Sequence, residues 1–326
     1  PWAKNHLIRF LIGLFIFFFV CLIDIKLILR LAYPLFFLNT LALILILFIG
    51  TETYGATRWI RFAGISLQPS EFIKVSLILC LAKYYHSIPV IEASKISRMV
   101  IPAIITLIPV GLVMIQPDLG TSIIILIGAG SIFWIIGINY KYFISAFALV
   151  CAAVPVGWQY LHNYQKERVY TFFNPERDPL GNGYHIMQSK IALGSGGLSG
   201  KGYLEGTQSH LNFLPEMHTD FIFTMFGEEF GFLGTIFLLI VYFSIILVSF
   251  NLAIKSRNSF GKYLSCGLIF LFFSHVFINI GMVMGLLPVV GVPLPLISYG
   301  GSSMLATMIS FGLIMNCYIN RDTILA

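Results

Sequence analysis

The chain has 326 residues, of which 58% are hydrophobic and only 10% are charged. Soluble domains carry about 25% charged residues, so this composition excludes an ordinary soluble protein. The net charge of +6 comes from basic residues that are scattered between apolar runs. Because they form no patch or stripe, we expect no nucleic acid among the partners. The cysteines show no CxxC spacing and the histidines no HExxH pair, so neither a disulfide framework nor a zinc site is indicated.

Apolar runs of about 20 residues, the length that crosses a bilayer, recur along the whole chain. They predict an all-α polytopic membrane protein, with residues 1–326 forming a single integral membrane domain. Nine spans place the first residue outside, whereas a tenth helix upstream would return the N-terminus to the cytoplasm. We therefore expect ten helices in the intact protein. The nine expected spans are 7–25, 31–50, 72–86, 99–115, 119–138, 142–161, 221–250, 263–286 and 304–318.

Most basic residues between the spans fall on one face, which the positive-inside rule makes cytoplasmic. The long segment 162–219 then lies outside, together with the short loops around Arg58, Asp118 and Pro295. This segment mixes apolar and aromatic residues with its glycines, so we expect an ordered cap and not a flexible linker. Substrate chemistry should face outward.

Asp220 is one of few acidic residues near membrane depth, where each charge is costly. It follows the letters LPEMHT and begins a long apolar helix at the outer surface. It is either a helix-start residue, whose charge suits the positive end of the helix dipole, or a catalytic carboxylate. Sequence position leaves both roles open.

Other acidic residues favour structural roles. Glu71 and Lys74 lie three residues apart in QPSEFIK and share one helix face, so we expect a structural ion pair. Asp118 in QPDLGTS begins another helix, where capping is favoured over a metal or substrate contact. Glu228 and Glu229 either line a polar pathway or pair with neighbouring helices, and the pattern does not separate these roles.

Two basic residues and one irregular loop are substrate-binding candidates. The segment GSGGLSGKG lacks the P-loop spacing, but Lys201 beside its glycines could hold an anion, although a mobile turn is favoured. Arg58 beside Trp59 is equally an interfacial anchor or a fork for phosphate oxygens. Ser298 and Tyr299 end a proline-rich loop that cannot form a regular helix, and irregular backbone at membrane depth normally lines a cavity.

Five motifs occur together and in order along most of the chain, from about residue 58 to residue 316. Together they closely resemble the SEDS family of bacterial cell-wall polymerases, and within it the elongation branch more than the division branch. Only the first helix of that family lacks a counterpart here. The motifs are QPSEFIK, QPDLGTS, NPERDPLGNGYHIMQSKIALGSGGLSGKG, FLPEMHTDFIFTMFGEEFG and LLPVVGVPLPLISYGGSS.

The resemblance implies a ten-helix SEDS fold and a peptidoglycan glycosyltransferase of cell elongation and rod shape. Such an enzyme polymerises lipid II into glycan strands and releases undecaprenyl pyrophosphate, in complex with a class B penicillin-binding transpeptidase. It would lie among the lipids of the bacterial cytoplasmic (inner) membrane, with its active site on the extracytoplasmic face. Asp220 matches the essential aspartate of the family, and Glu71 and Lys74 match its conserved pair.

This chemistry fits the residues. Attack by a sugar hydroxyl on an anomeric carbon needs a base, whereas a pyrophosphate leaving group needs no proton, so one carboxylate suffices. Arg58, Lys201 or a divalent metal, Mg or Mn, would stabilise the departing charge, and no organic cofactor is expected.

A lipid II flippase is the alternative function, because the segment before Tyr299 is broken and acidic residues lie at membrane depth. A scaffold for the transpeptidase is a third hypothesis, under which the charge of Asp220 is dispensable.

Overall fold

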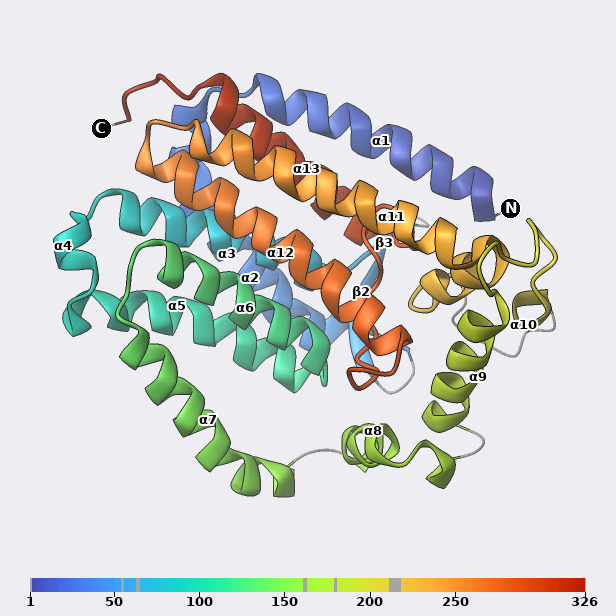
Figure 1. Cartoon of the computed structure of the whole chain (residues 1–326). Coiled ribbons are helices and arrows are strands. Elements are labelled where there is room, and N and C mark those ends of the chain that lie inside the picture. The colour runs from blue at the N-terminus through green and yellow to red at the C-terminus, as the bar shows by residue number, and fades with distance from the viewer. Residues whose placement is uncertain are drawn as a thin grey trace. The chain divides into compact units, whose positions relative to one another are not determined.

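The computed structural model describes residues 2–53, 56–62, 65–160, 163–178, 181–210 and 218–325 (Figure 1). The sequence predicts one membrane domain, and the contacts of the chain group it into two compact units. Unit 1 comprises Pro1–Tyr140, Ile246–Ser274 and Gly300–Ala326, and unit 2 comprises Lys141–Ile245 and His275–Tyr299. Each unit is described by itself.

Each of the nine expected spans falls on a helix. Within the described residues, seven of these helices are long and apolar enough to cross a membrane. The fifth of the nine helices, Leu119–Ile135, is apolar but shorter, and the third, Pro69–His86, carries Glu71, Lys74 and Lys83. The chain is therefore an all-α multi-pass membrane protein. The helices are α1 (Trp2–Leu22), α2 (Ile25–Ile49), α3 (Pro69–His86), α5 (Ile96–Ile115), α6 (Leu119–Ile135), α7 (Tyr140–Tyr160), α11 (Ile222–Ile254), α12 (Ser259–Val283) and α13 (Gly301–Ile319).

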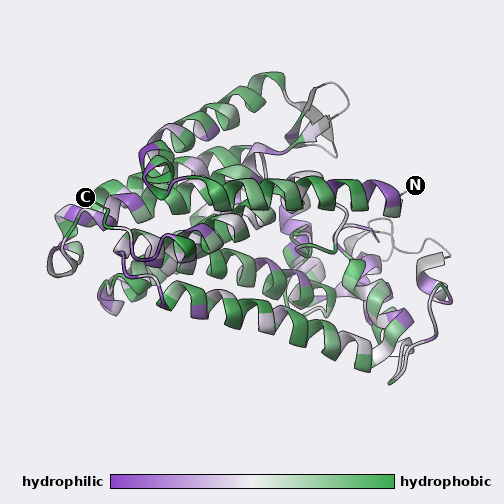
Figure 2. Cartoon of the chain, turned by 90° about the horizontal axis from the view of Figure 1, so that it is seen from above, coloured by the Kyte–Doolittle hydropathy of each residue, from purple (hydrophilic) through white to green (hydrophobic). Residues whose placement is uncertain are grey.

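The long helices expose apolar side chains. Figure 2 shows them hydrophobic over most of their length, and large residues such as Phe15, Phe37 and Phe237 are exposed. Lipid accommodates such a surface, whereas water would not.

Helix α3 is the most thoroughly buried helix of unit 1. It packs against α2, α5, α6 and α13, while α1 packs along α13 (Figure 1). Asn316 of α13 is wholly buried, and its amide donates hydrogen bonds to the carbonyls of Val20, Cys21 and Ile23 at the end of α1. These bonds satisfy carbonyls that a helix end leaves without partners.

A small antiparallel sheet lies between α2 and α3. Its strands are β1 (Thr51–Thr53), β2 (Ala56–Phe62) and β3 (Ile65–Leu67), in that order, with Thr51 opposite Trp59 and Ile60 opposite Leu67. From the sequence, this stretch is expected only as a short loop. The strands form because threonine, isoleucine and aromatic residues suit a pleated ladder.

The expected outer segment 162–219 is largely helical where it is described. It contains α8 (Asn163–Phe173), the 3₁₀ helix η1 (Pro175–Arg177), α9 (Asn182–Ser195) and α10 (Thr207–His210), while a further short helix, α4 (Val90–Ala93), lies in unit 1. The Ser189 hydroxyl of α9 lies 2.8 Å from that of Thr224 in α11 and donates to the Val283 carbonyl of α12. The described part of the segment is thus folded within unit 2, while residues 162, 179–180 and 211–217 lie outside the described ranges.

Candidate active site

The Glu71–Lys74 pair lies in the first turns of α3. Lys74 Nζ donates to Glu71 Oε1 at 2.8 Å, and both residues are buried. Because burial removes both charged groups from water, the attraction between them offsets the lost hydration. The structure therefore shows these residues as an internal ion pair.

Asp118 caps α6 and faces Arg58. Its carboxylate accepts hydrogen bonds from the main-chain N–H of Thr121 at 3.1 Å and from the Thr121 hydroxyl at 3.0 Å. Arg58 of β2 lies 3.8 Å from the same carboxylate and donates to the carbonyls of Gln116 and Pro117. Asp118 thus has the capping geometry that its position predicts, and Arg58 links the sheet to the start of α6.

The glycine-rich segment 194–202 is bonded to α11, which corrects the expectation of a mobile turn. The helical geometry of α11 breaks at Gly231, where φ is +64°. At this break, the N–H groups of Phe232 and Leu233 donate to the carbonyls of Gly197 and Leu198. A Cβ on Gly200 would clash with the Glu229 carbonyl, so glycine permits the close approach of the two backbones.

Lys201 forms an ion pair with Glu228 of α11. Its Nζ lies 2.7 Å from Glu228 Oε1, which also accepts from the N–H of Gln208 and the hydroxyl of Thr207. Glu228 is fully buried. The pyrophosphate role of Lys201 stays a prediction, and the pair with Glu228 offers a structural reason for the lysine. Of the two roles that the sequence leaves open for Glu228, a polar pathway or an ion pair, the structure shows the ion pair.

Asp220 lies in the turn that precedes α11 and is partly exposed. The N–H groups of Thr224 and Met225 donate to the Phe221 carbonyl, so Phe221 is the N-cap and Asp220 stands one residue earlier. The Asp220 carboxylate lies beside Gly291, where a Cβ would come 3.2 Å from Oδ2. Gly291 has a φ of +71°, a conformation that also favours glycine.

The segment 284–300 is irregular, as its prolines predict, and joins the turn around Asp220. The Ser298 hydroxyl donates to the Thr219 carbonyl at 2.6 Å, and the N–H of Tyr299 donates to the His218 carbonyl at 2.8 Å. Ser298 and Tyr299, both substrate-binding candidates from the sequence, are thus next to Asp220 in unit 2.

Asn279 of α12 and Gly291 belong to this site but are not among the residues predicted from the sequence. Asn279 is fully buried, and its Nδ2 donates to the carbonyls of Asp220 and Val292. A useful signal was present, because an amide inside the apolar run HVFINIGMV is costly unless it has partners. Gly291 gave no such signal.

The described residues contain no group of three or more histidine, cysteine, aspartate or glutamate side chains that could hold a metal ion. Mg²⁺ is often bound by one or two carboxylates together with substrate phosphates and water. Asp220 is compatible with such a site only as one ligand beside phosphate oxygens.

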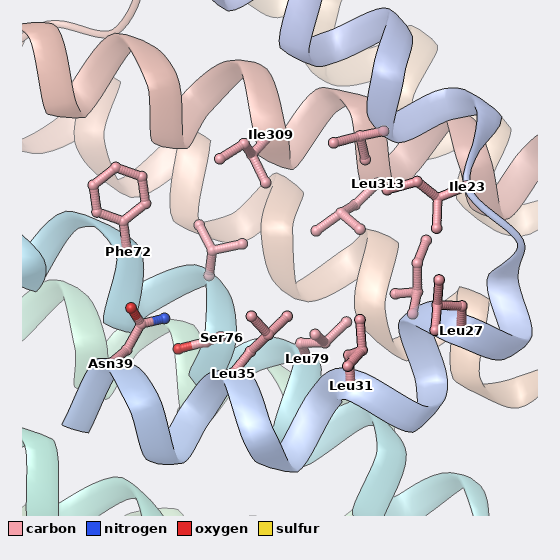
Figure 3. Close-up of a pocket in the computed structure, with 13 residues that line it drawn as sticks. Ile23, Leu27, Leu31, Leu35, Asn39, Phe72, Ser76, Leu79, Ile309 and Leu313 are labelled. Atoms are coloured by element: carbon pink, nitrogen blue, oxygen red, sulfur yellow. The ribbon is translucent and has the colours of Figure 1, made fainter. Parts of the chain in front are cut away.

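A cavity of about 290 Å³ lies within unit 1, between α2, α3 and α13 (Figure 3). Its lining is apolar except for Asn39 and Ser76, with Phe72, Leu35 and Leu313 among the surrounding side chains. Such a surface suits hydrocarbon better than sugar or phosphate. We therefore do not assign the reaction to this cavity.

These features define a polytopic membrane protein with a carboxylate at the start of a broken membrane helix. The model of the FtsW/RodA/SpoVE family, described as cell cycle proteins, matches residues 2–323. The chain belongs to this family, which is the SEDS family that its motifs resemble.

Named relatives and solved structures agree with this assignment. The peptidoglycan glycosyltransferase MrdB of Escherichia coli K12 is 43% identical over 83% of this chain and 73% of that protein. The probable peptidoglycan glycosyltransferase FtsW of Trichlorobacter lovleyi is 37% identical, covering 97% and 83% of the two chains. A chain from a peptidoglycan synthase complex that coordinates polymerization and crosslinking is 32% identical, with a TM-score of 0.84 and coverage of 98% and 90%. The Thermus thermophilus rod shape determining protein RodA is 27% identical, with a TM-score of 0.73 and coverage of 98% and 88%.

Proposed function

We propose that the chain is a peptidoglycan glycosyltransferase that polymerises lipid II into glycan strands for cell elongation and rod shape. The observation that carries the proposal is the partly exposed Asp220, in a turn bonded to segment 284–300. Family membership and the names of the relatives support the same activity.

Asp220 acts as the general base. It takes the proton of the acceptor sugar hydroxyl as that oxygen forms a bond to the anomeric carbon of the donor. The bond from this carbon to the pyrophosphate oxygen breaks, and undecaprenyl pyrophosphate leaves with the bonding electrons. Because this leaving group needs no proton, a second carboxylate is not required, unlike in glycoside hydrolases.

Cations stabilise the departing pyrophosphate. Arg58 and Lys201 are the candidates from the sequence, and each already faces a carboxylate of its own unit, Asp118 and Glu228 respectively. A divalent Mg or Mn ion bound to the phosphate oxygens would supply further positive charge. Asp220 as a ligand of that ion is the alternative to Asp220 as the base. Loss of strand formation in EDTA that is restored by Mg²⁺ or Mn²⁺ would support a metal requirement, and full activity in EDTA would exclude it.

The chain works in the bacterial inner membrane with Asp220 on the extracytoplasmic face, and a class B penicillin-binding transpeptidase is its partner. The positive-inside distribution of basic residues supports the orientation. The peptidoglycan synthase complex that contains a similar chain supports the partner.

The test is strand formation from lipid II by the full-length protein with its transpeptidase, comparing wild type with Asp220→Asn. This change removes the base and nearly preserves shape, so we expect turnover to fall roughly 10³-fold. An active wild type and an inactive, folded variant support the polymerase. Equal turnover would exclude Asp220 as the base. If neither forms strands, a lipid II flipping assay in vesicles tests the flippase alternative.

A further inference from the structure

Asn279, near the end of α12, has a role that the chemistry above does not assign. The residue is fully buried, and its Nδ2 donates to the Asp220 carbonyl at 2.8 Å and to the Val292 carbonyl at 2.7 Å. Both N–H groups of the amide are therefore in use. Asn279 joins two stretches of chain that lie far from one another in sequence.

These two carbonyls belong to the two segments that meet at the Asp220 carboxylate. The first is the carbonyl of Asp220 itself. The second belongs to Val292, which directly follows Gly291, the residue beside Asp220 Oδ2. The bonds of Asn279 thus set the spacing between the carboxylate and the backbone against which it packs.

Ser298 links the same two segments a second time. Its hydroxyl donates to the Thr219 carbonyl at 2.6 Å and accepts from the N–H of Leu294 at 2.7 Å. The residue is only 4% exposed. Two buried side chains, one from α12 and one from segment 284–300, therefore fix residues 219–220 against residues 292–294.

We propose that Asn279 and Ser298 are positioning residues that hold the Asp220 carboxylate in the orientation in which it accepts the proton. This inference rests on the proposed function and extends it to residues that need not touch the substrate. A base is effective only when it is held within hydrogen-bond reach of the proton. Side chains locked by buried hydrogen bonds supply that fixed geometry.

Asn279→Leu tests the proposal, because leucine has a similar size but no donor. We expect turnover to fall roughly 10²-fold as the base loses its alignment, while the KM for lipid II changes less than about threefold. Asn316→Leu is the matched control. Asn316 is also a fully buried helix asparagine that donates to main-chain carbonyls, but these carbonyls end α1 in unit 1. This control should lower thermal stability and leave the turnover of the folded protein unchanged.

Ser298→Ala provides a milder variant that tests the proposal even if Asn279→Leu does not fold. We expect it also to lower turnover with little change in KM. Because both residues fix one turn, the double variant should lose less than the product of the two single losses. The proposal is overturned if these variants lose only stability, as Asn316→Leu does, or if their losses multiply. Failure of the proposed function is distinguishable, since Asp220→Asn would then equal wild type.

Discussion

Asp118 and Asp220 both stand at the start of an apolar helix, yet the protein holds them in different ways. Asp118 is buried, and its carboxylate accepts two bonds from Thr121 and faces Arg58. Asp220 is partly exposed and precedes the N-cap of its helix, and the Asn279 amide holds it through its main-chain carbonyl.

This difference separates a structural carboxylate from a candidate base. A carboxylate that caps a helix and faces an arginine has a structural role. It accepts hydrogen bonds at the start of the helix, and its negative charge pairs with the arginine. The bond from Asn279 fixes the main chain of Asp220, and the residue remains partly exposed. Position in the sequence does not distinguish the two aspartates, whereas burial and the contact of Asp118 with Arg58 do.

Among the variants that test this difference, Asp220→Glu should have the largest effect. The variant keeps the charge and lengthens the side chain by one methylene, next to the close Gly291 backbone. We expect turnover to fall about 10²-fold, because a displacement of about 1 Å is enough for such a loss. Initial rates of strand formation measure it, with Asp118→Glu as the control that should retain turnover. A fully active Asp220→Glu would show that the carboxylate is not tightly placed.

Gly291→Ala should have the next largest effect. Its Cβ would lie 3.2 Å from Asp220 Oδ2 at a φ of +71°, so we expect turnover to fall roughly tenfold. Gly137→Ala is the matched control, because Gly137 has a φ of +88° and open space around its Cβ position. Both changes should cost about 1 kcal/mol of backbone strain. Equal turnover in the two variants would mean that crowding of Asp220 does not matter.

The sequence predicts the membrane helices well because span length and hydropathy are local properties. Each of the nine expected spans falls on a helix, although α13 begins at Gly301, before the expected start at residue 304. The small sheet is missed because its strands are short and lie between two strongly apolar runs. The segment 162–219 is expected to be ordered, but its helices are not located.

The site is predictable only in part. Spacing alone brings Glu71 and Lys74 together, and the family motif directs attention to Asp220. Asn279 cannot be matched to Asp220 in this way, since the two lie 59 residues apart and no periodic pattern connects them. In sequence, the glycines near Lys201 favour a mobile turn over phosphate binding, and only their contact with α11 shows that they pack against that helix.

Lys201→Met extends the comparison to a second buried carboxylate, Glu228. Like Asp118, Glu228 faces a basic side chain, in this case Lys201. Loss of Lys201 leaves Glu228 buried without its cation, which should cost about 3 kcal/mol of stability. We expect the molecules that fold to keep their KM for lipid II. Thermal unfolding measures the stability.

The double variant Lys201→Met with Glu228→Gln serves as the control, because it removes both charges and should recover much of the lost stability. If this double variant is stable but has a strongly raised KM for lipid II or a strongly lowered turnover, Lys201 stabilises the pyrophosphate.

Asp118→Asn should have the smallest effect on turnover. Asparagine is as good an N-cap as aspartate, so the bond from the Thr121 N–H can persist, while the Thr121 hydroxyl can turn to accept from the new amide. Only the charge facing Arg58 is lost, and Arg58 keeps the Gln116 and Pro117 carbonyls as acceptors. We expect a cost of about 1 kcal/mol and unchanged turnover. If Asp118→Asn instead abolished strand formation, as Asp220→Asn should, the Arg58–Asp118 pair would belong to the reacting site. The contacts of the two aspartates would then not identify which of them is the base.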